Sequence, residues 1–134
     1  MQENNEHVQS DRILVPLAQR KEIIDNLLSW LDQACHLWYS DIVLIHIAEP
    51  LWIKNTPYTA FQAVRLLSEQ AEIEKELQNE FNAIAERVRR RISRLNIRAI
   101  VKTSHTPVET IVEYADQISA DYIVLLARKR SGFE

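Results

Sequence analysis

The sequence predicts an α/β domain in which a doubly wound parallel sheet carries helices on both faces. Short apolar runs alternate along the 134 residues with longer segments whose apolar residues recur every three or four positions. This is the pattern of strands alternating with amphipathic helices. The short runs are apolar throughout, which is typical of strands buried on both faces, and helical crossovers between such strands imply a parallel sheet with right-handed connections. Four such strands are visible in this chain.

The first half of the chain is predicted to contain two strands and one helix. Residues 1–11 are polar and rich in Gln, Asn and Glu, so we expect them to form a disordered leader. The strands are expected at Ile13–Leu17 and Asp41–Glu49, where the apolar runs are continuous. Between them, the spacing of apolar residues predicts a helix over Arg20–Trp38.

A loop and a long helix are predicted next. Leu51–Tyr58 contains proline and asparagine and is expected to be a loop. Thr59–Leu95 keeps one apolar face throughout, with glutamates early and arginines late, an order that complements the helix dipole. The late arginines, Arg87–Arg94, form the main basic cluster, which we interpret as a solvated helix end because no aromatic residues interleave with it.

The last third of the chain is predicted to hold two strands around one helix. The strands are expected at Asn96–Thr103 and Tyr122–Ala127. The helix between them runs to about Ile118 and begins with a predicted capping box, in which Thr106 caps, proline takes the first helical position and Glu109 completes the box.

The composition indicates one soluble domain. Apolar residues make up 46% and charged residues 26% of the chain, and the net charge of −3 gives no general attraction to nucleic acid or anionic membranes. No apolar run approaches the length needed to span a bilayer, and the polar N-terminus has no signal sequence, so a cytoplasmic location is expected. The lone cysteine, Cys35, lies on an apolar stripe and is expected to be a buried thiol.

Glycine is very scarce. Average usage of about 7% would give roughly nine glycines in this length, and the chain has one, Gly132. We therefore expect few positions with positive φ, and the scarcity of glycine argues against any site in which a glycine-rich loop binds the ligand.

Three segments, ILVPL, SDIVLIHIAEP and TPVETIVEYADQISADYIVLLARKRSG, together resemble the universal stress protein family. The most specific pieces are the HIAEP strand end, the Pro107 helix start and the R-x-R-S-G that follows the last strand. The resemblance implies one domain over residues 12–134 with the adenine nucleotide alpha hydrolase-like fold. Because the family sheet has five strands, it also implies that this domain is truncated at the C-terminus and lacks the last helix and fifth strand.

The resemblance implies a family divided into members that bind ATP and members that do not. In binding members an acidic residue after the first strand holds the ribose, the end of the second strand receives adenine, and a glycine-rich loop after the fourth strand holds phosphates. The ribose position falls on Ala18, which has no side-chain oxygen, and the adenine position on Ile47. Two loop glycines are replaced by Leu126 and Lys129, which do not favour close phosphate approach or positive φ.

We therefore expect a degenerate nucleotide site and no cofactor. If ATP or AMP were bound, basic side chains would hold the phosphates by charge in place of glycines. The cofactor-binding residues would then be Ile47, Arg128, Lys129, Arg130 and Gly132.

Other polar residues offer weaker candidates for chemistry. His46, Glu49 and His105 lie near strand ends, where a metal or acid/base set is conceivable, but a packed, hydrogen-bonded His46 and an exposed His105 are the favoured interpretations. Ser104, His105 and Glu109 are triad residue types, yet Glu109 is already assigned to a helix cap. We expect no catalytic residue and no metal site.

The favoured function is a regulatory or interaction module of the universal stress type that acts as an oligomer, without ATP and without enzymatic activity. Two alternatives remain open: an adenine-nucleotide binder that uses the basic loop, and a cytoplasmic regulatory domain of a larger protein such as a transporter. We expect a homodimer or higher oligomer, because Tyr122–Ala127 would lie at the edge of the sheet and Trp30 and Leu37 would form an exposed apolar patch. A protein partner is compatible with each alternative, whereas nucleic acid and membrane insertion are disfavoured.

Overall fold

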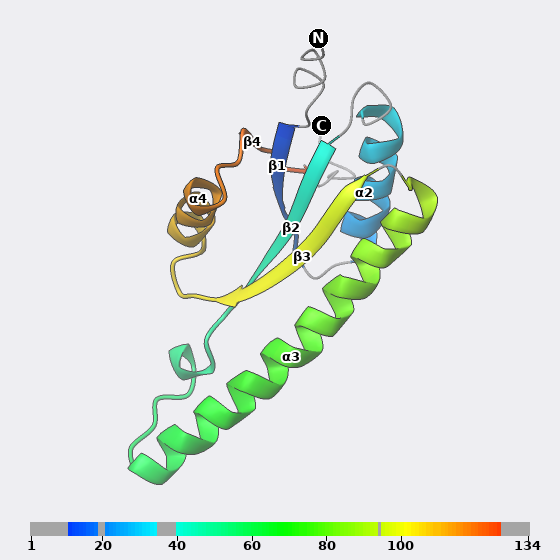
Figure 1. Ribbon diagram of the computed structural model, residues 1–134. Helices are drawn as coiled ribbons and strands as arrows, with labels where there is room; N and C mark the ends of the chain where they lie inside the picture. Colours follow the sequence, from blue (N-terminus) through cyan, green and yellow to red (C-terminus); the bar gives the residue numbers. More distant parts are fainter. Residues whose placement is uncertain (1–10, 19–20, 35–39, 94, 127–134) are drawn as a thin grey trace, which may run out of the picture.

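The computed structural model describes residues 11–18, 21–34, 40–93 and 95–126, and it confirms the doubly wound α/β fold. One parallel sheet has the strand order β3-β2-β1-β4 (Figure 1). Its strands are β1 (Asp11–Pro16), β2 (Ser40–Ala48), β3 (Asn96–Thr103) and β4 (Tyr122–Ile123). The helices are α2 (Lys21–Ala34), α3 (Ala60–Arg91), α4 (Pro107–Gln117) and the short 3₁₀ helix η1 (Leu51–Ile53).

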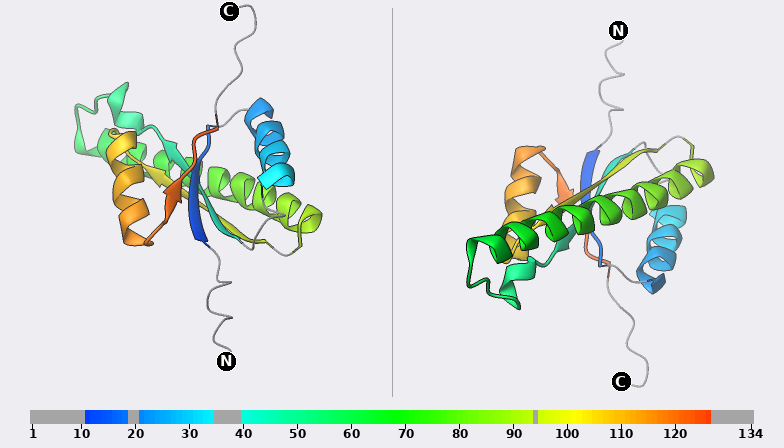
Figure 2. Two further views of the ribbon diagram at one scale, coloured as in Figure 1. Left: turned by 90° about the horizontal axis from the view of Figure 1, so that it is seen from above. Right: turned by 90° about the horizontal axis from the view of Figure 1, so that it is seen from below.

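The connections place helices on both faces of the sheet. The chain moves outward from β1 to β2 and β3, and then returns across the sheet to β4. Because parallel crossovers are right-handed, α2 and α3 lie on one face and α4 lies on the other (Figure 2). The topological switch point is therefore between β1 and β4.

Alternate residues of the central strands feed two separate cores. On the α2 and α3 side, Ile13 and Val15 of β1 pack with the helices, whereas Leu14 between them packs toward α4. The side chains buried on the α4 side are Leu14, Val43, Ile45 and Ala115. This pattern confirms that β1 and β2 are buried on both faces.

Polar side chains of α3 cover the outer edge of β3, which the sequence did not reveal. The Gln78 side-chain amide donates to the carbonyl of Ala99 at 3.0 Å and accepts from the backbone N–H of Val101 at 3.0 Å. Arg89 donates to the carbonyl of Ile97 at 2.7 Å. A strand edge with unpaired backbone groups attracts other chains, so α3 protects β3 much as a neighbouring strand would.

β4 departs most from expectation. It has two residues rather than the six predicted over Tyr122–Ala127, and residues 127–134 lie outside the described part of the chain. Within that part, β4 pairs only with β1 and is the last strand of the sheet, as predicted. The expected burial on both faces is wrong, because Tyr122 is 57% and Leu125 74% exposed, and no described segment packs beyond β4.

Parts of the predicted first helix and leader are not described. α2 is described over Lys21–Ala34, while residues 35–39, including Cys35 and Leu37, lie outside the described residues, as do residues 1–10 of the expected leader. Trp30 was expected in an exposed patch but is half-buried against the α2 and α3 core. In α3, arginines occupy the last turn, but no acidic residue lies in the first turn, so the dipole argument holds only at the C-terminal end.

The C-terminal end of α4 is formed without glycine. Ser119 has a φ of 57°, and among the described residues no other non-glycine residue has a positive φ. The N–H of Ser119 bonds to the carbonyl of Asp116 at 3.1 Å, and that of Ala120 to the carbonyl of Ala115 at 2.9 Å. These two bonds form a Schellman motif, in which glycine normally takes the position of Ser119.

Ser119→Gly is expected to raise the free energy of unfolding by about 0.5 to 1 kcal/mol, because glycine adopts positive φ without a Cβ clash. Ser29, exposed within α2, provides the matched control, since Ser29→Gly introduces glycine at an ordinary helical position and should lower the free energy by about 0.5 kcal/mol. Urea unfolding monitored by circular dichroism measures both. Destabilisation by Ser119→Gly would show that the observed backbone conformation is not the one in solution.

Candidate functional site

A small cavity of about 220 Å³ lies at the carboxyl end of the sheet. It is formed where the chain leaves β2, where it leaves β3, and by η1. Its lining residues are Ile47, Glu49, Ile53, Ser104, His105 and Pro107. Ligands of open α/β sheets bind at this end of the strands, so the cavity is the first candidate site.

Ile47 forms the apolar wall of this cavity. It is half-buried and also packs with the cluster beneath α4. Glu49 is exposed and lies 3.8 Å from the ammonium group of Lys54, so its carboxylate has a neighbouring cation. The structure thus brings together Ile47, Glu49 and His105, three of the residues considered from sequence.

Ser104 lies in the turn that precedes α4, where its side chain accepts two hydrogen bonds. Its Oγ accepts from the backbone N–H of Thr106 at 3.0 Å and from the hydroxyl of Thr110 at 2.6 Å. The capping box predicted for Thr106 and Glu109 is wrong, because the side chain of Thr106 makes no cap hydrogen bond; its hydroxyl lies 3.2 Å from that of Ser104 instead. With its hydroxyl engaged in this way, Ser104 is not arranged as a nucleophile activated by His105.

His46 belongs to the other face of the sheet, because consecutive strand residues point to opposite sides. Its Nδ1 donates to the carbonyl of Leu17 at 2.8 Å, and its ring stacks on Phe81 with centroids 4.8 Å apart. This confirms the predicted packed histidine and separates it from Glu49 and His105. Among the described residues, no group of three His, Cys, Asp or Glu side chains is close enough to hold a metal ion.

The positions implied for a nucleotide are only partly described. Ala18, after β1, is exposed and offers no side-chain oxygen, and Leu126, after β4, is half-buried against the α2 and α3 core. Both residues flank the switch point, the place where a doubly wound sheet binds ligands most often. Arg128, Lys129, Arg130 and Gly132 lie outside the described residues.

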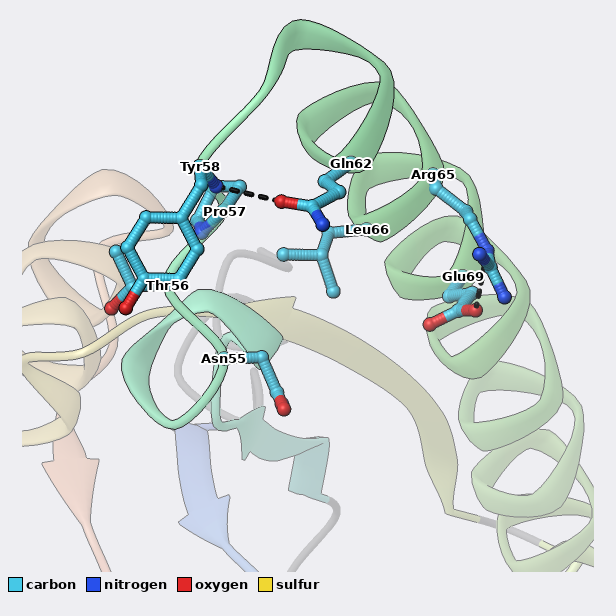
Figure 3. A pocket seen from close by; sticks show the side chains of 8 residues that line it. All are labelled: Asn55, Thr56, Pro57, Tyr58, Gln62, Arg65, Leu66 and Glu69. Carbon is cyan, nitrogen blue, oxygen red and sulfur yellow. Dashed lines mark hydrogen bonds and ion pairs between the residues drawn. The ribbon is translucent and has the colours of Figure 1, made fainter.

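A larger cavity of about 330 Å³ lies between the loop before α3 and the first turns of that helix (Figure 3). Its lining residues are Asn55, Thr56, Pro57, Tyr58, Gln62, Arg65, Leu66 and Glu69. The backbone N–H of Tyr58 donates to the side chain of Gln62 at 2.8 Å, and the Gln62 N–H donates to the Thr59 hydroxyl at 3.1 Å, so these contacts join the loop to the helix start. Sequence reasoning missed this cavity, because only the fold brings the loop against the helix.

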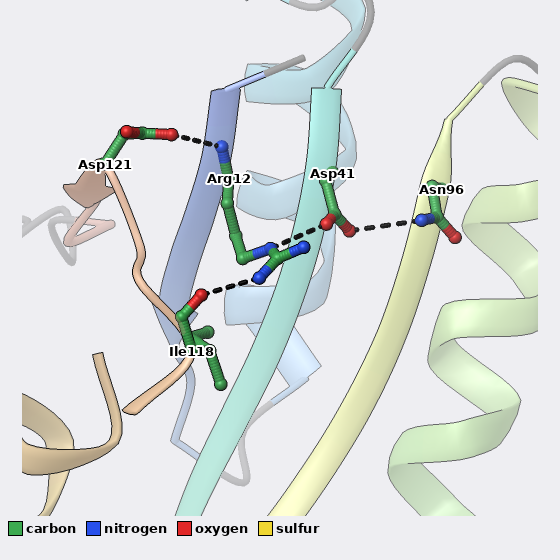
Figure 4. A network of polar contacts seen from close by, with 5 residues as sticks. All are labelled: Arg12, Asp41, Asn96, Ile118 and Asp121. Atoms are coloured by element: carbon green, nitrogen blue, oxygen red, sulfur yellow. Dashed lines mark hydrogen bonds and ion pairs between the residues drawn. The ribbon is translucent and has the colours of Figure 1, made fainter. Parts of the chain in front are cut away.

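Polar groups at the amino end of the sheet have a structural role (Figure 4). The guanidinium of Arg12 donates to Asp41 at 2.8 Å and to the carbonyl of Ile118 at 2.6 Å, and its backbone N–H donates to Asp121 at 2.8 Å. Asn96 donates to Asp41 at 3.3 Å. The network links β1, β2, β3 and the chain entering β4, at the end of the sheet opposite the small cavity.

The basic cluster at the end of α3 is largely paired. Arg89 and Arg90 contact Glu86, and Arg91 donates to Asp32 of α2 at 2.7 Å. These contacts support the interpretation of a solvated helix end. None of the described helices combines the length and the apolar character required to cross a bilayer.

Comparison with known proteins gives one family match. The model of the universal stress protein family matches residues 9–134. No curated protein sequence matches the chain significantly.

Solved structures show the same fold. The hypothetical protein MJ0577, whose biochemical function was assigned from its structure, aligns with a TM-score of 0.68 at 17% identity, over 92% of this chain and 79% of its own. Universal stress protein UspA from Lactobacillus plantarum aligns with a TM-score of 0.68 at 16% identity, over 94% and 83%. The hypothetical protein PH0823 gives 0.67 at 16% identity, over 92% and 78%. At these identities the likeness establishes the fold and leaves the chemistry to the residues of this chain.

Proposed function

Because the chain belongs to the universal stress protein family, we propose that it is a cytoplasmic regulatory or interaction module that acts as an oligomer, without ATP binding and without catalysis. The observation that carries this proposal is the pair of apolar residues at the switch point. Ala18 lacks an oxygen for a ribose hydroxyl, and the Leu126 side chain packs toward the core. A bound nucleotide would leave polar groups without partners at both positions, which is energetically costly.

The alternative is an adenine-nucleotide binder in which Ile47 contacts the base and Arg128, Lys129, Arg130 and Gly132 hold the phosphates. The position of Ile47 in the wall of the small cavity favours this alternative. The cavity volume of about 220 Å³ is below the usual 300 to 1,000 Å³ of small-molecule sites. The cavity therefore fits a base better than a whole nucleotide, and we rank the alternative second.

ATP, ADP and AMP at about 1 mM are expected to leave the melting temperature unchanged, because we propose that the chain binds none of them. A ligand that did bind would raise the melting temperature, since at 100 times its Kd it adds about 2.7 kcal/mol to the free energy of unfolding. Differential scanning calorimetry of the wild-type chain measures the shift. If a nucleotide raises the melting temperature and the double variant Arg128→Ala, Lys129→Ala loses that increase, the basic-loop binder is correct and our proposal is wrong.

The oligomer we propose forms through β4. Gln78 and Arg89 occupy the backbone groups of β3, so that edge of the sheet is covered by α3. At the other edge, Tyr122 and Leu125 are largely exposed and the described chain places no strand beyond β4. An apolar open edge favours pairing with another chain, and a second copy supplies the same edge.

Sedimentation velocity at about 10 μM, a concentration that populates complexes with a Kd in the micromolar range, should show a dimer or larger species. Ile123→Lys places a charge on the open strand and should shift the population toward monomer. Val108→Lys adds the same charge on an exposed position of α4 and should have no effect. A monomeric wild-type chain that does not bind a hydrophobic dye would contradict this proposal.

A further inference from the structure

The first turns of α3 extend beyond the carboxyl end of the sheet (Figure 1). Gln70 is the first residue of the helix that is buried, and Leu77 is the first apolar one. Before Gln70, three large apolar side chains are mostly exposed: Phe61 at 74%, Val64 at 64% and Leu67 at 60%. These residues cluster on a short stretch of one helix, which distinguishes them from scattered surface apolar residues.

Two of these residues, Val64 and Leu67, belong to a heptad-like stripe that runs along the whole helix, and Phe61 lies beside it. We call its first four residues, Ala60, Val64, Leu67 and Ala71, the α3 seam; all four are exposed, and their spacing of four, three and four places them on one side. The same spacing continues through Glu74 and Gln78 at the edge of β3 to residues packed against the sheet, Phe81, Ala85 and Val88. The stripe is thus covered in its second half and uncovered in its first.

The loop before α3 does not cover the seam. It lies against the opposite flank of the helix, where Gln62, Arg65, Leu66 and Glu69 line the larger cavity (Figure 3). On a helix these positions lie roughly 100° to 180° away from the middle of the seam. The described chain therefore leaves the seam open to another molecule.

We propose that the α3 seam pairs with the seam of a second copy of this chain, in antiparallel orientation. The seam has a palindromic order of sizes: alanine, valine, leucine, alanine. A two-fold axis midway between Val64 and Leu67 places each of these opposite the other in the second copy, and places Ala60 opposite Ala71. Val64 and Leu67 pack against each other at the centre of the pair, and the alanines at its ends allow the two backbones to approach closely.

The charge distribution on α3 also favours pairing with a second copy of this chain. The residues that flank the seam over its length, Phe61, Ala63, Ser68 and Gln70, carry no charge. The neighbouring charges, Arg65, Glu69 and Glu72, lie on the far side of the helix. Two copies can therefore pair without burying a charge or opposing like charges, both of which would oppose association.

The expected association is weak and is independent of β4. The seam covers twelve residues, or about 17 Å of helix, so the pair buries less than the roughly 1,200 Å² of a standard stable interface. α3 lies along the β3 side of the sheet, whereas β4 forms the other edge. Two separate self-complementary surfaces on one chain lead to assemblies larger than a dimer.

Disulfide trapping between two differently labelled copies tests the pairing directly. In a Cys35→Ser background, Ala60→Cys protein is mixed with Ala71→Cys protein under mild oxidation. The mixture should form covalent dimers that combine one chain of each kind. Neither protein alone should do so, because identical positions lie about 16 Å apart along the antiparallel pair, well beyond the roughly 7 Å limit for Cα atoms in a disulfide.

The control pair is Arg65→Cys mixed with Glu72→Cys, two exposed residues on the far side of the same helix. It reports random collision, and its yield should be several-fold lower than that of the seam pair. Circular dichroism confirms that each variant is folded. If the seam mixture yields no more covalent dimer than the control, or if Ala60→Cys alone gives the higher yield, the antiparallel seam is wrong.

A charge substitution provides a second readout that does not depend on cysteine. Val64→Glu should abolish the concentration-dependent association that remains when Ile123→Lys has weakened β4 pairing. Ala83→Glu adds the same charge at an exposed position of α3 away from the seam and should leave that association unchanged. Equal behaviour of the two glutamate variants would overturn the proposal, and would do so whether or not the β4 dimer is correct.

Discussion

The contact between α3 and the outer edge of β3 determines which surfaces of this molecule remain open. Gln78 bonds two backbone groups of β3, and Arg89 bonds a third. Nearer the carboxyl end, Gln70 accepts from the backbone N–H of Leu51 at 2.7 Å and lies 3.4 Å from the hydroxyl of Thr103. These bonds fix a 32-residue helix along one side of the sheet, so its first turns extend past the strands.

Several features follow from this placement. The β3 edge is covered, which leaves β4 as the open edge of the described sheet. The extended first turns of α3 create the larger cavity with the preceding loop on one flank, and they expose the seam on the other. Side-chain amides thus perform a protective function that many proteins assign to an additional strand or to edge charges.

Scarcity of glycine acts as a second constraint on function. With one glycine in 134 residues, the chain has few places where its backbone can approach a phosphate closely. Ser119 shows that the fold accepts a serine at positive φ where glycine would be usual. At the switch point, Ala18 and Leu126 are both apolar, and this is the basis on which we propose a role in protein association.

The sequence predicted the elements of the fold well, because continuous apolar runs mark buried parallel strands; β3 was predicted with its observed bounds, Asn96–Thr103. It did not predict the edge bonds of Gln78, since a glutamine on a helix has the same sequence signature as a solvent-exposed residue. Thr106 was correctly predicted as the residue before the helix, but its expected side-chain cap bond is absent and its N–H instead bonds the Ser104 hydroxyl, a detail that local patterns do not specify. At the candidate site, Ile47 was recognised through the family resemblance, whereas the cavity around it depends on segments far apart in the chain.

The role of α3 as a substitute neighbour for β3 can be measured most directly by native-state hydrogen exchange at the Val101 amide. In the wild-type chain this N–H should be protected, because Gln78 accepts its hydrogen bond. In Gln78→Ala it should exchange much faster, while the amide of Leu44 in the central strand β2 keeps its protection. A Val101 amide that exchanges at the same rate in both proteins would contradict the account.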